Sequence, residues 1–278
     1  MTRQGLGGLM ISAEMRNWQV GLERILDAPA ERDTLQLIQE VCDFAAEIGH
    51  DNGDALLDAC PQLLQYRPSF VDEFRHNVVG REIAEADRLL AADIAAPISF
   101  RAVAAPHSVG MYDRLADVIA DVDFSTCRRV VMVGCGWRPI TIFSLHDQTS
   151  VPEIIGLDIV PEAVRSATAL AAKLGYGRMR AELCDGRIYD YAGVQRVYIA
   201  SMVTAKSAVI SRILNTAPDD VRIILWEPYS LGRLWMESAE RQLDPRLEVT
   251  GRGTVSRLAR DVFIKRRAEP VSAPATRS

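Results

Sequence analysis

The chain has 278 residues, a net charge of −5, 48% hydrophobic and 25% charged residues, values typical of a folded globular protein. They exclude intrinsic disorder, collagen-like repeats and a disulfide scaffold. The longest apolar runs fall far short of a membrane span, and the acidic balance provides no basic field for nucleic acid or for an anionic membrane. We therefore expect a small-molecule partner, no nucleic acid and no membrane.

Five cysteines occur without C-x-x-C spacing, mostly within apolar segments. An odd number in such surroundings indicates reduced, buried thiols. The start of the chain shows no apolar run of signal-peptide length followed by a cleavage site. The sequence therefore predicts a cytoplasmic protein.

The first section of the chain is expected to be helical, because apolar residues recur at three-and-four spacing from about residue 14 to residue 122. We interpret residues 1–122 as an N-terminal helical cap. Within it, the stretch Val78–Ala95 carries charges on one side, which predicts a solvated helix face. Those charged residues are Arg81, Glu82, Glu85, Asp87 and Arg88. A last helix, about Val109–Ile119, leads directly into the next section.

From residue 129 the pattern changes to short β-branched runs separated by helices, which is typical of a doubly wound parallel sheet. The expected strands are Arg129–Val133, Glu153–Asp158, Met179–Cys184, Val197–Ala200, Val221–Trp226, Leu247–Thr250 and Asp261–Lys265. The expected helices are Pro161–Leu174, Lys206–Leu214 and about Leu231–Ala239. This order is found in class I S-adenosylmethionine (SAM) methyltransferase folds. We therefore predict an α/β protein with a class I SAM-methyltransferase-like (Rossmann-like) doubly wound sheet over 123–268, and a disordered tail over 269–278.

A glycine motif follows the first of these strands. Gly134-Cys135-Gly136-Trp-Arg138-Pro139 is expected to form a turn and a helix start with the proline at its first position. Glycine lets a nucleotide approach the backbone closely, and a helix N-terminus offers free N–H groups. Asp158, twenty-two residues after Gly136, ends the second strand, where an acid accepts hydrogen bonds from both ribose hydroxyls. Asp185 follows the third strand, where such folds contact adenine. These features together favour an adenosyl ligand.

NAD is the competing ligand for a strand, glycine turn and acid in this order. The third glycine of the dinucleotide motif would fall at Pro139, whose ring stands where close helix packing is needed. The helix that follows is also expected to end within two turns. We therefore favour SAM over NAD.

The segments Gly134–Thr141, Ile199–Lys206 and Ser230–Trp235 resemble segments of nicotianamine synthases and their bacterial opine-metallophore relatives. Gly134–Thr141 resembles the family's GSGPLPLT-type segment, Ile199–Lys206 resembles its strand-four segment, and Ser230–Trp235 is similar to its HGxRxxLYP stretch. The likeness covers about residues 100–265, and a helical domain ahead of a methyltransferase-like core is also the family arrangement.

This resemblance implies attack on the methionine Cγ of SAM, so that the 3-amino-3-carboxypropyl group moves and 5′-methylthioadenosine is released. The group passes to an amine or, by attack of SAM's own α-amine, closes to azetidine-2-carboxylate; both belong to specialised metabolism. The family's FPYYxNY motif aligns on His107–Tyr112, where Tyr112 keeps the last tyrosine but Ser108 and Val109 replace the tyrosine pair. A conventional small-molecule methyltransferase and a SAM-binding regulator stay open as alternatives.

The predicted site residues fall into two groups. The candidate catalytic residues are Tyr112, His107 and Ser201. The candidate SAM-binding residues are Gly134, Cys135, Gly136, Arg138, Asp158, Ile159, Asp185, Gly186, Ser201 and Met202. Arg138 is expected to bind a carboxylate and Trp137 to shield the sulfonium, against the alternative of a surface arginine beside a packed tryptophan. We expect no metal, and a homodimer is left open.

Overall fold

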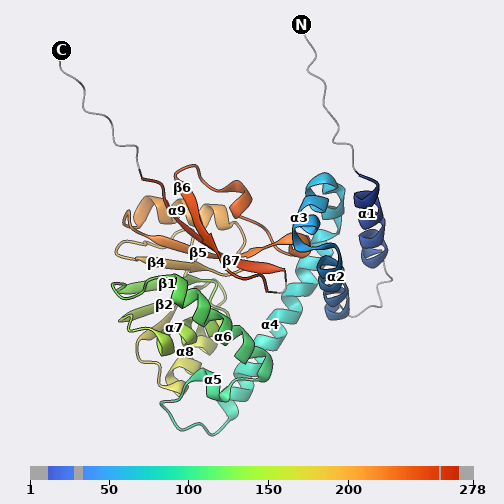
Figure 1. Cartoon of the computed structure of the whole chain (residues 1–278). Coiled ribbons are helices and arrows are strands. Elements are labelled where there is room, and N and C mark those ends of the chain that lie inside the picture. Colours follow the sequence, from blue (N-terminus) through green and yellow to red (C-terminus); the bar gives the residue numbers. More distant parts are fainter. Residues whose placement is uncertain (1–11, 28–33, 257, 269–278) are drawn as a thin grey trace, which may run out of the picture.

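The computed structural model describes residues 12–27, 34–256 and 258–268 (Figure 1). The first residues of the chain and the predicted disordered tail over 269–278 lie outside these ranges. None of the described helices is both long and apolar enough to cross a membrane.

The N-terminal section is helical, as predicted. It comprises α1 (Ala13–Leu26), α2 (Thr34–Ile48), α3 (His50–Ala59), the 3₁₀ helix η1 (Pro61–Tyr66), α4 (Arg67–Ala91), α5 (Phe100–Val103) and α6 (Pro106–Asp121). The first three helices form a group beside the sheet, and α4 runs from this group toward α5 (Figure 1). Leu22 and Leu56 share a buried cluster with Leu234, which lies after the fifth strand, so this helical group packs on the later part of the chain.

A seven-stranded sheet forms the rest, in the order β3-β2-β1-β4-β5-β7-β6. Its strands are β1 (Arg129–Val133), β2 (Glu153–Asp158), β3 (Met179–Leu183), β4 (Arg196–Ile199), β5 (Arg222–Pro228), β6 (Leu247–Arg252) and β7 (Ala259–Arg266). The first five are parallel, and β7 pairs antiparallel with both β5 and β6. This topology confirms the predicted class I SAM-methyltransferase-like fold. The order reverses between β1 and β4, which places a ligand crevice at the carboxyl ends of these strands.

Helices cover both faces of the sheet. Val130 and Met132 of β1 pack in a cluster with α6, α7 (Ile140–Gln148) and α8 (Pro161–Leu174). Val131 and Val133 face the opposite cluster, which contains α9 (Lys206–Thr216). Alternate residues of a strand point to opposite faces, so both sets are buried and the strand is apolar throughout.

The helix expected at about Leu231–Ala239 does not form. Two 3₁₀ helices, η2 (Ser230–Leu234) and η3 (Glu240–Gln242), occupy this region. The physical reason lies in Lys206 and Glu227, a buried ion pair at 2.9 Å. Lys206 Nζ donates to the Glu237 carbonyl, and Glu227 Oε2 accepts the backbone N–H groups of Ala239 and Glu240. Glu227 therefore holds two backbone N–H groups that a continuous helix would have paired with the carbonyls four residues earlier.

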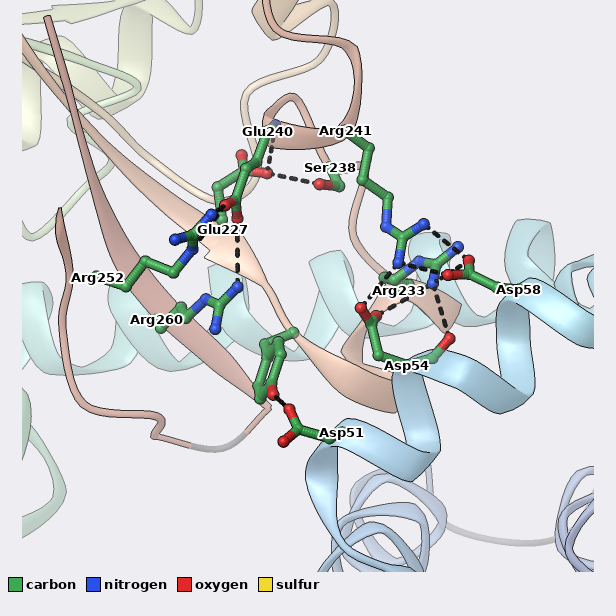
Figure 2. A network of polar contacts seen from close by, with 11 residues as sticks. Asp51, Asp54, Asp58, Glu227, Arg233, Ser238, Glu240, Arg241, Arg252 and Arg260 are labelled. Carbon is green, nitrogen blue, oxygen red and sulfur yellow. Dashed lines mark hydrogen bonds and ion pairs between the residues drawn. The ribbon is translucent and has the colours of Figure 1, made fainter. Parts of the chain in front are cut away.

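Polar contacts fasten α3 to the segment after β5 (Figure 2). Arg233 of η2 and Arg241 of η3 each contact Asp54 and Asp58 of α3, at distances from 2.7 to 3.1 Å. Two cations thus share two carboxylates, in a network that fixes the helical group against the loop. Arg233, which belongs to the stretch similar to HGxRxxLYP, therefore joins this stretch to α3.

We expect Gly53→Ala to lower the free energy of unfolding by about 1–3 kcal/mol. A Cβ at this α3 position would lie 2.2 Å from Ser230 Oγ, in the tight contact between α3 and η2. The matched control is Gly80→Ala in α4, where a Cβ would meet nothing within 4 Å. This second change should stabilise by about 0.5–1 kcal/mol, because alanine favours helix. Urea unfolding of both variants measures the difference, and equal shifts would contradict the contact.

Candidate functional site

The glycine turn after β1 has the backbone shape that the motif predicted. Gly134 and Gly136 have φ values of 78° and 70°, in the left-handed region that favours glycine. Asp158 closes the turn: its Oδ2 accepts the Gly136 N–H at 2.9 Å, and its Oδ1 accepts the Val160 N–H at 3.0 Å. Pro139, expected at the first helical position, is instead the N-cap of α7, one position before its first helical residue Ile140. The turn thus brings backbone and a carboxylate to one edge of the sheet.

A hollow of about 130 Å³ lies at the carboxyl ends of β1, β2 and β3. Its lining includes the predicted residues Gly134, Asp158, Ile159, Asp185, Gly186 and Met202. Ile159 is 66% exposed and presents an apolar surface immediately after Asp158. The Arg187 side chain forms hydrogen bonds to Asp185 and lowers the pKa of this carboxyl. The hollow therefore offers an apolar wall and the carboxyl groups of two aspartates, which fits the adenosine part of an adenosyl ligand.

Glu82 of α4 lies against the glycine turn. Its Oε2 accepts the Trp137 N–H at 3.3 Å, and a Cβ on Gly136 would lie 2.5 Å from the same oxygen. Burial raises the pKa of Glu82 to about 7, and the positive charge of Arg138 offsets this only in part. A carboxyl group whose pKa is about 7 therefore lies beside the turn.

A buried ion pair supports this arrangement. Glu85 and Arg138 are 4% and 5% exposed, and the Arg138 Nη1 contacts Glu85 Oε2 and donates to Ser108 Oγ. Burial alone would raise the pKa of Glu85, but hydrogen bonds from Ser108 and Ala105 and the charge of Arg138 hold it below its usual value. Arg138, predicted to bind a ligand carboxylate, is instead joined to a protein carboxylate. Its buried Nε has no hydrogen-bond partner within the described residues.

A second cavity of about 420 Å³ adjoins the hollow. Met202, Val203 and Thr204, which follow β4, line both spaces, and Ser201 lines the cavity. The opposite walls come from α4 and from the segment after η2, which contribute Phe74, Arg75, Trp235 and Met236 among others. This volume is within the usual range of small-molecule sites, roughly 300–1,000 Å³. The predicted Met202 therefore lies between the two neighbouring spaces, and the predicted Ser201 lies in the wall of the larger one, at the ligand edge of the sheet.

The other two predicted catalytic residues, and the predicted SAM-binding Cys135, lie elsewhere. The Tyr112 hydroxyl donates to Asp147 Oδ2 at 2.8 Å, in the last turn of α7, at the far end of this helix from the glycine turn. His107 precedes the helix expected at about Val109–Ile119 but lies in the first turn of α6, with Nε2 3.4 Å from Glu85 Oε2. Cys135 is buried beneath the turn, and burial raises the pKa of its thiol. The structure brings none of these three side chains to either space.

Glu82 and Glu85 were not among the site residues predicted from the sequence. The prediction of a solvated face holds for Arg81, Asp87 and Arg88, which are exposed, but is wrong for Glu85, which is buried. A signal was present in the spacing, because Glu82 and Glu85 share a helix stripe with the buried Leu89. An acidic residue within an apolar helix stripe indicates a carboxylate that is paired with a polar group of another segment. Within the described ranges, no three His, Cys, Asp or Glu side chains gather in a way that could hold a metal ion.

The architecture of nearly the whole chain is similar to that of solved structures. Neither a protein-family model nor a curated protein sequence matches the chain. Among solved structures, a single-residue mutant of the nicotianamine synthase MtNAS in complex with S-adenosylmethionine is similar with a TM-score of 0.73 and 17% identity, over 90% of this chain and 98% of that chain. This chain has the fold of MtNAS. MtNAS in complex with MTA and tNA matches with a TM-score of 0.69 and 17% identity, over 92% of this chain and 97% of that one.

The likeness to MtNAS extends beyond the sheet. Because it covers nine-tenths of this chain, it includes helices of the N-terminal section as well as the sheet. The resemblance that three short motifs indicated is thereby confirmed for the fold.

Proposed function

We propose that this chain is a SAM-dependent enzyme that uses the 3-amino-3-carboxypropyl group of SAM and releases 5′-methylthioadenosine. The observation that carries the proposal is the near-complete likeness to MtNAS, of which one structure, of a single-residue mutant, is a complex with S-adenosylmethionine and another is a complex with MTA and tNA. In this chain α4, from the helical section, places Glu82 against the glycine turn. In this proposal the enzyme acts in the cytoplasm. It belongs to specialised metabolism and acts on small molecules.

The donor site in this proposal is the hollow beside the glycine turn. Asp158 would accept hydrogen bonds from the ribose hydroxyls, and Asp185 would face the adenine. Ile159 would pack against the base through its exposed apolar side chain. The left-handed turn at Gly134 and Gly136 leaves backbone, without a Cβ, next to the rest of the donor.

Glu82 is the carboxylate that the geometry favours as a general base. A sulfonium activates all three adjacent carbons, so the protein selects among them by position. An amine must also lose a proton when it forms its new bond to carbon. Glu82 lies at the glycine turn and titrates near neutrality, as a base working at physiological pH requires. The ion pair of Glu85 with Arg138 one turn further along α4 would hold this helix in place.

The experiment that tests the proposal follows the fate of SAM. The purified chain is incubated with SAM, alone and with an extract of small metabolites, and the nucleoside product is identified by mass spectrometry. We expect 5′-methylthioadenosine. Formation of S-adenosylhomocysteine would mean methyl transfer, and saturable SAM binding with neither product would mean a regulator; either result contradicts the proposal.

A further inference from the structure

Three charged side chains line the cavity of about 420 Å³ beside the donor hollow. Asp72 and Glu237 are exposed, whereas Arg75 is partly buried. Within the described residues, no hydrogen bond or ion pair engages any of these side chains. Asp72 and Arg75 are three positions apart in α4 and therefore neighbours on its surface. The cavity thus holds one inner cation and two outer anions, all available to a ligand.

Most of the remaining lining is apolar. Phe74 and Trp235 form a tilted aromatic pair with ring centroids 6.1 Å apart, and Leu64, Val71, Met202 and Met236 add aliphatic and thioether surface. Trp235 and Met236 are buried, so much of their surface already packs against protein. A ligand that fills this cavity therefore places an apolar group against these side chains.

The wall that contains Trp235 and Met236 is held from two sides. Lys206 and Glu227, which are 1% and 0% exposed, bind the backbone just after it. Arg233 just before it is fastened to α3 by Asp54 and Asp58 (Figure 2). A wall fixed at both ends forms before a ligand arrives, so binding costs little ordering of the protein.

The same face of α4 connects this cavity with the proposed base. Val71, Arg75 and Glu82 follow at spacings of four and seven residues, which puts them on one stripe of the helix. Seven residues of α-helix span about 10 Å. A ligand held at Arg75 therefore has Glu82 and the glycine turn within the length of one small molecule.

We propose that the acceptor of the aminocarboxypropyl group is an α-amino acid with an apolar side chain, bound in this cavity. Its carboxylate pairs with Arg75, its side chain packs on Phe74, Trp235 and Met236, and its α-amine points along α4 toward the donor. This inference rests on the proposed function and selects transfer to an external amine over cyclisation of SAM. Asp72 and Glu237 at the outer part disfavour ligands whose side chains are anionic.

The transfer step balances without a further reactant. The lone pair of the neutral α-amine forms a bond to Cγ of SAM while the Cγ–S bond breaks. The electron pair of that bond stays on sulfur, which becomes the neutral thioether of 5′-methylthioadenosine. The attacking nitrogen becomes a secondary ammonium, and its surplus proton passes to Glu82.

The first test measures acceptor dependence with the full chain and saturating SAM. L-phenylalanine, L-leucine, L-methionine, L-glutamate and L-lysine are added singly, and 5′-methylthioadenosine and the amino-acid adduct are followed by mass spectrometry. We expect at least one of the three apolar amino acids to raise 5′-methylthioadenosine release about tenfold or more over SAM alone, with the matching adduct. Equal release with no amino acid, or stimulation by glutamate or lysine only, overturns the acceptor inference but leaves the proposed function standing. Formation of S-adenosylhomocysteine overturns both.

A second test isolates Arg75. In Arg75→Gln we expect the KM for the apolar amino acid to rise about tenfold or more, with SAM affinity by calorimetry unchanged. The wild-type chain should also prefer L-phenylalanine to 2-phenylethylamine, which lacks the carboxylate, and the variant should lose this preference. The control is Arg81→Gln, an exposed arginine of the same helix outside the cavity, which should retain it. An unchanged preference in Arg75→Gln overturns the assignment, because a purely structural role cannot depend on the acceptor's carboxylate.

Discussion

Glu82→Gln is expected to lower kcat by about 100-fold or more while SAM still binds, because an amide cannot take the proton that the attacking amine releases. The wild-type kcat/KM should rise with pH through about 7, since burial raises the pKa of Glu82 to that value and only the ionised form is a base. The variant should lose this limb of the profile. Steady-state kinetics across pH and SAM calorimetry measure the two effects separately.

The exposed Asp87 of the same helix provides the control for this change. Asp87→Asn makes the same carboxyl-to-amide replacement away from the turn and should leave both rate and pH profile unchanged. If Glu82→Gln weakens SAM binding as strongly as it slows turnover, Glu82 holds the donor and is not the base.

The pH dependence of folding stability tests the raised pKa of Glu82 independently of catalysis. Its folded pKa lies above the unfolded value of 4.5, so the folded state binds this proton more tightly. The contribution of Glu82 to stability is therefore greatest below the unfolded pKa and decreases as pH rises toward about 7. The free energy of unfolding of Glu82→Gln, measured relative to wild type by urea unfolding, should therefore be higher at pH 8 than at pH 4.

Asp158→Asn is expected to raise the Kd for SAM by about 10- to 100-fold, since charge-assisted hydrogen bonds are worth roughly 1.5–3 kcal/mol. The carboxylate accepts the Gly136 N–H with one oxygen and the Val160 N–H with the other, and both oxygens keep lone pairs for a ribose. An amide replaces one acceptor oxygen by an N–H donor, so it loses contacts both to the backbone N–H groups and to the ribose. Asp219→Asn, at a carboxyl that is 99% exposed, is the control. Calorimetric affinity within a factor of two of wild type would contradict the ribose role of Asp158.

The sheet could be predicted from the sequence because its elements depend on local signals. The helix Pro161–Leu174 has the predicted limits, with Pro161 in its first turn and Gly175 as a left-handed cap with φ of 81°. The glycine turn and Asp158 were likewise predictable, because their positions follow from strand ends in a parallel sheet.

The candidate site could be predicted only in part, because half of it depends on how distant segments pack. Glu82 becomes a site residue when α4 crosses to the glycine turn, and no spacing within α4 specifies that partner. Tyr112 matched a family motif, yet the contact of its hydroxyl with Asp147 depends on the packing of α6 against α7. The region Leu231–Ala239 has the composition of a helix, but the buried pair of Lys206 and Glu227 competes for its backbone.

The short segment Met202–Thr204 is a wall of both the hollow proposed to hold the donor and the cavity proposed to hold the acceptor. If both spaces hold their proposed ligands, any shift that one ligand imposes on this shared backbone changes the free energy with which the other ligand binds. Thermodynamic linkage makes this effect mutual: the factor by which SAM alters acceptor affinity equals the factor by which the acceptor alters SAM affinity. Positive coupling would fill the two spaces together and keep the reactive sulfonium from standing exposed to water without its partner.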